Sequence, residues 1–194
     1  YWTDEADRRR EHVSLSDRYA RFYSEIAKIV ARECPGRMLG AYAYSAYRTV
    51  PIEQTLEPNI LVGFVGISYV SRENYEADKE IFDGWAERSS AIFWRPNLLN
   101  GGMGFPQNFA RPLGRDVAAM ADRGLTVTDF DCQYQHWALK GLTYYVLAEM
   151  LAEPDADPDA IIDDYCAAGF GPAAEEVRAY FDGVEAITSR IFAD

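Results

Sequence analysis

Cysteine and histidine are both scarce in this chain, and their scarcity excludes several kinds of site. The 194 residues include three cysteines, Cys34, Cys132 and Cys166, and two histidines. An odd number of widely spaced cysteines fits neither a disulfide framework nor a CxxC metal site, so we interpret them as small buried hydrophobic residues. His12 and His136 lie far apart in the sequence. No histidine cluster for zinc is therefore expected, and we predict no metal and no cofactor.

Positive charge and long apolar runs are also in short supply. The 31 acidic residues exceed the 19 basic ones and give a formal net charge of −12. Such a chain repels phosphate backbones and anionic membrane surfaces, so we predict no nucleic-acid and no membrane partner. The basic run Arg8-Arg9-Arg10 is flanked by Asp7 and Glu11 and is interpreted as a solvated helix face.

Targeting signals leave the compartment undecided. No stretch approaches the ~20 consecutive apolar residues of a membrane-spanning helix, and no basic and apolar leader is present. Because the chain begins at Tyr1 rather than Met, a leader could have been removed.

Hydrophobic residues make up 48% of the chain, which is enough for the core of a single α/β domain over residues 1–194. Amphipathic stretches alternate with short apolar runs bounded by Gly, Pro and Asn. Helices are predicted from Ser16 to Cys34, from Ser71 past Trp85, around Leu113 to Met120, from Trp137 to Leu151, and from Pro158 and Pro172 onward. Strands are predicted at 38–46, 60–68, 91–99 and from Leu125 to Thr128. The alternation predicts four parallel βα units with additional C-terminal helices.

Polar and aromatic residues follow the predicted strands, where parallel sheets bind their ligands. The candidates are Tyr44 and Arg48 after the first strand, Trp94, Arg95 and Asn97 after the third, and Asp129, Asp131, Gln133, His136 and Trp137 after the fourth. Carboxylates and amides can bridge sugar hydroxyls, and flat rings can cover the apolar faces of a pyranose. The set therefore suggests a saccharide ligand.

Two carboxylates and one Trp-Arg pair carry most of this hypothesis. Asp129 and Asp131 are two apart on a strand and point to one side, so both could bind sugar hydroxyls or serve in catalysis; the alternative is a cap or turn role. Trp94 is predicted to be a ring platform and Arg95 a clamp for a substrate oxyanion. For Arg95 the alternative is an ion pair with a neighbouring carboxylate.

The remaining candidates have stronger structural alternatives. Tyr44 and Arg48 follow the first strand as Trp94 and Arg95 follow the third, and they are candidates for the same roles. Tyr42 is instead predicted to pack. His136 is more typical of a hydrogen-bonded residue at the start of a helix than of a proton shuttle. Gln133 and Trp137 are included because the next turn brings them close to the two aspartates.

Two further motifs lack residues that a calcium loop or a phosphate-binding loop requires. The "DADPDA" run at 155–160 has Ala160 and Cys166 where a calcium loop needs Gly and Glu. The "NGGMG" run at 100–104 lacks the tail of a phosphate-binding loop, so a phosphate-binding α/β enzyme is only weakly indicated.

Several stretches together resemble a bacterial family of unknown function whose members look like glycoside hydrolases. They are "SDRYARFYSEIAKIV", "GAYAYSAYRTVP", "LEPNILV" and the run from "WALKGLTYYVLAEMLAEPDADPDAIIDDY" to "GFGPAAEEVRAYF". The family is similar in organisation to the α-glucuronidases and β-hexosaminidases, which are built on (β/α)8 barrels.

The resemblance implies a glycoside hydrolase-like protein acting on an acidic or N-acetylated sugar in carbohydrate metabolism. A complete barrel needs eight βα units, so four units imply about half of a TIM barrel, its carboxyl-terminal half. The expected partner is a missing N-terminal half-barrel or a second copy of the chain. A noncatalytic carbohydrate-binding or structural barrel module is the alternative.

Overall fold

The structure, a computed structural model, describes residues 14–67, 69, 72–97, 107–131 and 137–193. These residues form two compact units. The first unit contains the described residues of 14–67, 76–97 and 124–131, and the second contains 69, 72–75, 107–123 and 137–193. The single-domain interpretation of residues 1–194 stays a prediction.

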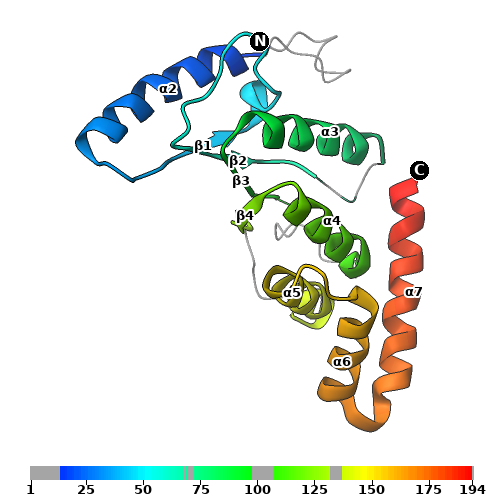
Figure 1. The fold of residues 1–194 in the computed structure, drawn as a ribbon. Coiled ribbons are helices and arrows are strands. Elements are labelled where there is room, and N and C mark those ends of the chain that lie inside the picture. Colours follow the sequence, from blue (N-terminus) through cyan, green and yellow to red (C-terminus); the bar gives the residue numbers. More distant parts are fainter. Residues whose placement is uncertain (1–13, 68, 70–71, 98–106, 132–136, 194) are drawn as a thin grey trace. The chain divides into compact units, whose positions relative to one another are not determined.

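A four-stranded parallel sheet is the centre of the first unit (Figure 1). Its strands lie in the order β1, β2, β3, β4, with bounds Leu39–Ala43, Ile60–Phe64, Ala91–Trp94 and Leu125–Thr128. Helices α2 (Ser16–Glu33), α3 (Arg72–Arg88) and α4 (Ala110–Asp122) alternate with these strands along the chain, and a 3-10 turn, η1 (Ser45–Tyr47), follows β1. The predicted α/β fold of four parallel βα units is confirmed, and it is consistent with half of a barrel.

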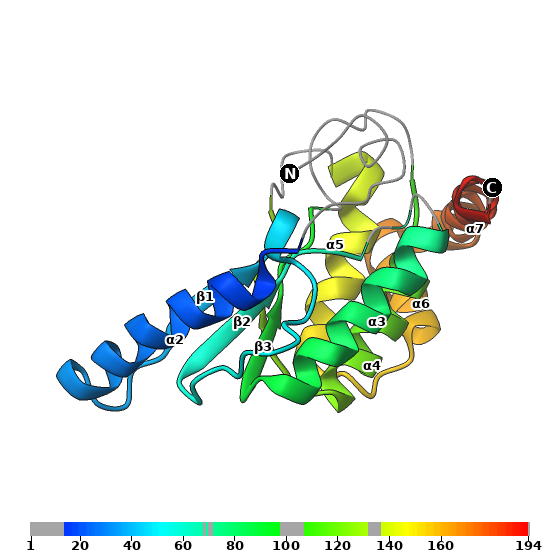
Figure 2. The ribbon, with the colours of Figure 1, turned by 90° about the horizontal axis from the view of Figure 1, so that it is seen from above.

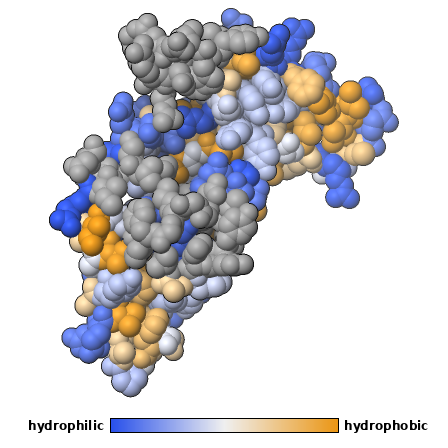
Figure 3. Space-filling model, turned by 180° about the vertical axis from the view of Figure 1, so that it is seen from behind, coloured by the Kyte–Doolittle hydropathy of each residue, from blue (hydrophilic) through white to orange (hydrophobic). Residues whose placement is uncertain are grey.

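Helix α2 packs against the sheet through its small residues. Figure 2 shows α2 alongside β1 and β2, and its buried residues include Ala20, Ser24 and Ala27. The helix was predicted, but its buried face differs from the aromatic stripe in the sequence, because Phe22 and Ile29 are exposed. Hydrophobic surface is accordingly visible at the α2 end of the first unit in Figure 3.

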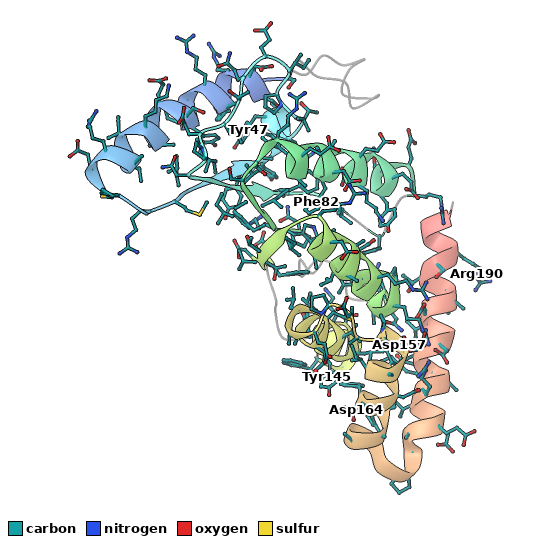
Figure 4. The ribbon with its side chains drawn as sticks, viewed as in Figure 1. Tyr47, Phe82, Tyr145, Asp157, Asp164 and Arg190 are labelled. Atoms are coloured by element: carbon teal, nitrogen blue, oxygen red, sulfur yellow. The ribbon has the colours of Figure 1, made fainter. Side chains whose placement is uncertain are left out.

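The two faces of the sheet have different environments. Parallel register pairs Ala41 with Val62 and Ala43 with Phe64, and this face is buried. Phe82 of α3 packs edge-on against Phe64 with 5.9 Å between ring centroids, and Figure 4 labels Phe82 on that helix. This face is therefore the core of the unit.

The opposite face carries Tyr42, Gly63, Phe93 and Val127 in one row across the four strands. Tyr42 is 43% exposed and Val127 is 49% exposed, while Gly63 and Phe93 between them are buried, so this face is open at its two outer strands. Sheets made only of parallel strands are normally covered on both faces. A bulge at β4 sets the end of the row, since Ile92 pairs with Leu125 and Phe93 with Val127. The Thr126 hydroxyl donates to the Ile92 carbonyl at 2.9 Å and fixes this shift.

Helices make up the described part of the second unit. They are the first residues of α3, then α4, α5 (Trp137–Ala152), α6 (Pro158–Phe170) and α7 (Ala174–Ala193), with a 3-10 turn, η2 (Gly171–Ala173), before α7. Asp157 caps α6 by accepting from the Asp159 amide at 3.0 Å, and Pro158 takes the first helical position as predicted. Pro172 lies in η2 instead of opening α7.

An ion-pair network joins three of these helices. Arg111 of α4 pairs with Asp159 of α6 at 2.7 Å, with Asp182 of α7 at 2.7 Å, and with Glu185. These partners raise the pKa of Arg111 against the opposing effect of burial. The guanidinium therefore stays charged and ties α4, α6 and α7 together.

Candidate functional site

Five side chains meet at the carboxyl ends of β1, β3 and β4, on the exposed face of the sheet. We call them the strand-end cluster, and its members are Tyr42, Arg95, Asn97, Asp129 and Asp131. All five belong to the first unit. The structure thus brings together four of the residues predicted from sequence, and adds Tyr42.

Backbone hydrogen bonds continue the sheet past its last regular strand residues and so place these side chains. The Arg95 amide donates to the Phe64 carbonyl at 2.9 Å, and the Asp129 amide donates to the Trp94 carbonyl at 2.9 Å. The Asp131 amide donates to the Pro96 carbonyl at 3.3 Å. Because the chain stays extended, residues two apart keep to one side, as predicted for the two aspartates.

Arg95 is the central residue of the cluster. Its Nη1 donates to Asn97 Oδ1 at 2.8 Å, and its Nη2 lies 3.2 Å from Asp131 Oδ2. Its Nε lies 3.8 Å from Asp129 Oδ2, which is too long for a hydrogen bond, and this buried Nε has no hydrogen-bond partner. The alternative interpretation of Arg95, an ion pair with neighbouring carboxylates, is therefore what the structure shows.

Tyr42 joins the cluster from β1 by two contacts. Its hydroxyl donates to Asp129 Oδ2 at 3.2 Å, and the Arg95 guanidinium carbon lies 5.5 Å from the centroid of its ring. Its edge packs on Phe93 at 5.7 Å between centroids. Tyr42 packs, as the sequence predicted, and it also contacts Asp129 and Arg95, which the sequence did not predict.

The cluster remains open to solvent on its carboxylate side. The Asp129 side chain is 57% exposed, whereas the Asp131 side chain is 32% exposed and that of Arg95 is 23% exposed. The cluster therefore offers an aromatic ring and exposed carboxylate oxygens to anything that approaches this face. Chemically, that combination can accept hydrogen bonds and cover an apolar surface.

Trp94 does not provide the predicted ring platform in this structure. Its side chain is fully buried, its Nε1 donates to the Gly66 carbonyl at 3.0 Å, and its ring packs edge-on against Phe130. Register pairs Trp94 with Phe64, on the core face of the sheet. The correction follows from strand geometry, because Trp94 and Arg95 are consecutive and must point to opposite faces.

Arg48 forms an ion pair within the protein, with Asp78. Its Nη1 pairs with Oδ1 of Asp78, a buried residue of α3, and its carbonyl accepts from Trp85 Nε1 at 2.7 Å. Desolvation raises the pKa of Asp78, while Arg48 and the Ile67 amide act in the opposite direction. We therefore assign Arg48 to this internal pair and not to a substrate clamp.

Asp78 also fixes the backbone just after β2. The Ile67 amide donates to Asp78 Oδ2 at 2.7 Å, and Ile67 has a φ of 64°. A β-branched residue rarely adopts this left-handed conformation, so the carboxylate holds a strained turn in place. Asp78 had no signal in the sequence beyond its position on the helix.

Tyr44 and Trp137 lie apart from these contacts. Tyr44 follows β1 on the same side as Tyr42 and is 46% exposed. Trp137 begins α5 in the second unit, is 68% exposed, and packs edge-on against Tyr144. Gln133 and His136 lie outside the described residues, so their predicted roles stay predictions.

Neither a metal centre nor a membrane span is found in the described part of the chain. Among residues 14–67, 69, 72–97, 107–131 and 137–193, no group of three or more His, Cys, Asp or Glu could hold a metal ion. Over the same ranges, every helix is too short or too polar to cross a bilayer.

Comparison with known proteins gives one match. No curated protein and no solved structure matches the chain. A family model matches residues 3–182, which is most of the chain. The chain therefore belongs to the family described as a domain of unknown function, DUF4838.

Proposed function

We propose that this protein is glycoside hydrolase-like and holds a sugar at the carboxyl ends of its strands. The observation that carries the proposal is the strand-end cluster, in which an aromatic ring, a guanidinium and two carboxylates share one exposed sheet face. Sugar recognition needs both flat rings and oriented acceptors. The substrate class, an acidic or N-acetylated sugar, comes from the family resemblance.

Each member of the cluster has a distinct part in this proposal. Tyr42 presents its ring to the apolar face of a sugar, and Asp129 accepts from sugar hydroxyls with its exposed oxygens. Arg95 orients both carboxylates, and Asn97 restrains Arg95 in turn. Tyr44 extends the aromatic surface along the same side. Trp94 contributes by packing and not by contact with the ligand.

A direct catalytic role for Asp129 or Asp131 is a further step of the proposal. Hydrolysis of a glycosidic bond commonly needs two carboxyl groups placed on either side of that bond. Asp129 and Asp131 both lie beside the Arg95 guanidinium, at the end of the same strand. Their shared engagement by Arg95 supports the second candidate function, a noncatalytic carbohydrate-binding module.

We also propose that a partner covers the open parts of the sheet. Within the described residues β1 and β4 each pair with one neighbour, and Tyr42 and Val127 on these two outer strands are exposed. Unpaired edges are normally covered in soluble proteins. A second copy of the chain or an N-terminal half-barrel would cover both. Light scattering that finds a stable monomer in the absence of any partner would contradict this proposal.

Sugar binding is tested by titrating the protein with monosaccharides while recording amide NMR spectra. Asp129→Asn is expected to weaken binding about tenfold, which corresponds to one lost charge-assisted hydrogen bond of ~1.4 kcal/mol. Glu87→Gln, an exposed carboxylate change on α3 of the same unit, is the matched control and should leave binding unchanged. Absence of binding by any sugar in the panel would refute the proposal.

Hydrolysis is tested separately on nitrophenyl glycosides of glucuronic acid and N-acetylglucosamine. Release of nitrophenol that falls in Asp129→Asn, while the circular dichroism spectrum is unchanged, supports a hydrolase. Sugar binding without turnover supports the noncatalytic module. If Asp129→Asn unfolds the protein but keeps full binding per folded molecule, Asp129 is a structural cap.

A further inference from the structure

The guanidinium of Arg95 is already occupied by groups of the protein. One terminal nitrogen donates to Asn97 Oδ1 at 2.8 Å, and the other lies 3.2 Å from Asp131 Oδ2. The Nε is buried, and it is directed toward Asp129 at 3.8 Å. The Tyr42 ring lies 5.5 Å from the guanidinium carbon. Both terminal nitrogens of the guanidinium therefore face side chains of the cluster, and the Nε, which has no hydrogen-bond partner, is buried away from solvent.

This arrangement determines which ligand groups the cluster can receive. Proteins recognise carboxylates most specifically through an open guanidinium edge that makes two parallel hydrogen bonds. Arg95 has no such edge free, because the Nε is buried and each terminal nitrogen faces a side chain of the cluster. A uronic acid carboxylate would have to displace Asn97 or Asp131 to reach it.

The net charge of the cluster also disfavours a carboxylate ligand. The five residues contain two carboxylates and one guanidinium, which sum to one negative charge. Asp129 is the more exposed carboxylate, at 57% of its side chain. Its oxygens can accept hydrogen bonds from a ligand but repel another anion.

We propose that the strand-end cluster selects sugars that present hydroxyl or ammonium donors, and that it discriminates against uronic acids. This inference rests on the proposed saccharide function and revises its substrate class: it excludes the acidic sugars that the family resemblance suggests and favours neutral and amino sugars. Asp129 is the residue that determines this specificity. Two unit charges ~4 Å apart in water repel enough to weaken binding about fivefold, which sets the expected scale.

The experiment compares three methyl glycosides that share one ring: glucoside, glucosaminide and glucuronide. Binding of each to the full chain is measured by amide NMR titration at about pH 6, where the amine is protonated. We expect the glucosaminide to bind most tightly and the glucuronide at least about fivefold more weakly than the glucoside. Raising sodium chloride to about 0.5 M should narrow both differences, because salt screens exposed charges.

Variants assign the selectivity to Asp129. Asp129→Asn should bring the glucuronide-to-glucoside ratio of dissociation constants at least about threefold closer to one, while Glu87→Gln should leave it unchanged. Should Asp129→Asn fail to fold, the salt dependence of the unmodified protein decides the question. A glucuronide that binds as tightly as the glucoside, or more tightly, overturns the inference and leaves sugar binding standing. Binding of none of the three refutes the proposed function itself.

Discussion

Replacement of Gly63 by alanine should disrupt the packing that supports Tyr42. A Cβ at Gly63 would lie 2.2 Å from Cζ of Phe93, 2.6 Å from Cε1 and 2.8 Å from Cε2. Real Cβ contacts are not that short, so the Phe93 ring would have to move by roughly 1 Å or more to regain an ordinary contact of ~3.5 Å. Phe93 is 9% exposed and packs against Tyr42, which leaves the ring little room to move.

The expected cost follows from the general behaviour of overpacked sites. Adding one methyl group to a filled position typically destabilises by ~1–3 kcal/mol. For a chain of this length that corresponds to a fall in melting temperature of about 2–12 °C. Tryptophan fluorescence during urea unfolding reports the change, because Trp85 and Trp94 are both buried in the same unit as Gly63.

Gly40 provides a matched control on the same face of the sheet. A Cβ at Gly40 meets nothing within 4 Å, so Gly40→Ala should be neutral or stabilising by up to ~1 kcal/mol. Phe93→Leu in the Gly63→Ala background should recover part of the lost stability, since it removes the atoms in conflict. Equal effects of the two alanine substitutions would refute the steric reasoning.

Three further experiments, with four substitutions, test local features. Desolvation raises the pKa of Asp17, but hydrogen bonds from three backbone amides outweigh it, so the pKa is lowered overall. Asp17→Asn should therefore destabilise the protein at neutral pH. Urea titrations should show that the difference in stability between the variant and the unmodified protein vanishes as pH falls below about 4. Gly124 has a φ of 90°, so Gly124→Ala should cost ~1 kcal/mol, whereas Gly169→Ala in α6 should stabilise by up to ~1 kcal/mol; thermal melts that rank them otherwise would contradict this. The hydrogen bond to Asp164 raises the pKa of Tyr145 to about 12, and Figure 4 labels both residues; Asp164→Asn should lower that pKa toward 10 in an ultraviolet titration.

The fold was predictable because its signals are local. Periodic apolar residues and the Cys34-Pro35-Gly36 stop placed α2, and short apolar runs bounded by Gly and Pro placed the strands. The buried face of α2 was not predictable by the same rule, since hydrophobicity alone favours the large rings. Close packing of the helix on the sheet instead selects Ala20, Ser24 and Ala27.

The candidate site was only partly predictable. Asp129, Asp131, Arg95 and Asn97 come together because the carboxyl ends of parallel strands share one edge of the sheet. The placement of Tyr42 depends on the register between strands, which the sequence does not state directly.

The roles of Trp94 and Arg48 depend on contacts that the sequence could not fully supply. Period-two alternation would have separated Trp94 from Arg95, had it been applied to consecutive residues. The pairing of Arg48 with Asp78 could not be predicted, because it joins a loop to a helix that is distant in the sequence.

Residues that alternate along β1 belong to two different environments of the sheet. Along β1, Ala41 and Ala43 are packed against the core, while Tyr42 between them reaches the strand-end cluster. A substitution of Tyr42 therefore changes the strand-end cluster and the contact with Phe93, while Ala41 and Ala43 keep their packing on the opposite face. On β1 the residues that form the core and the residue that forms the cluster thus alternate along the chain, so the two can be substituted separately.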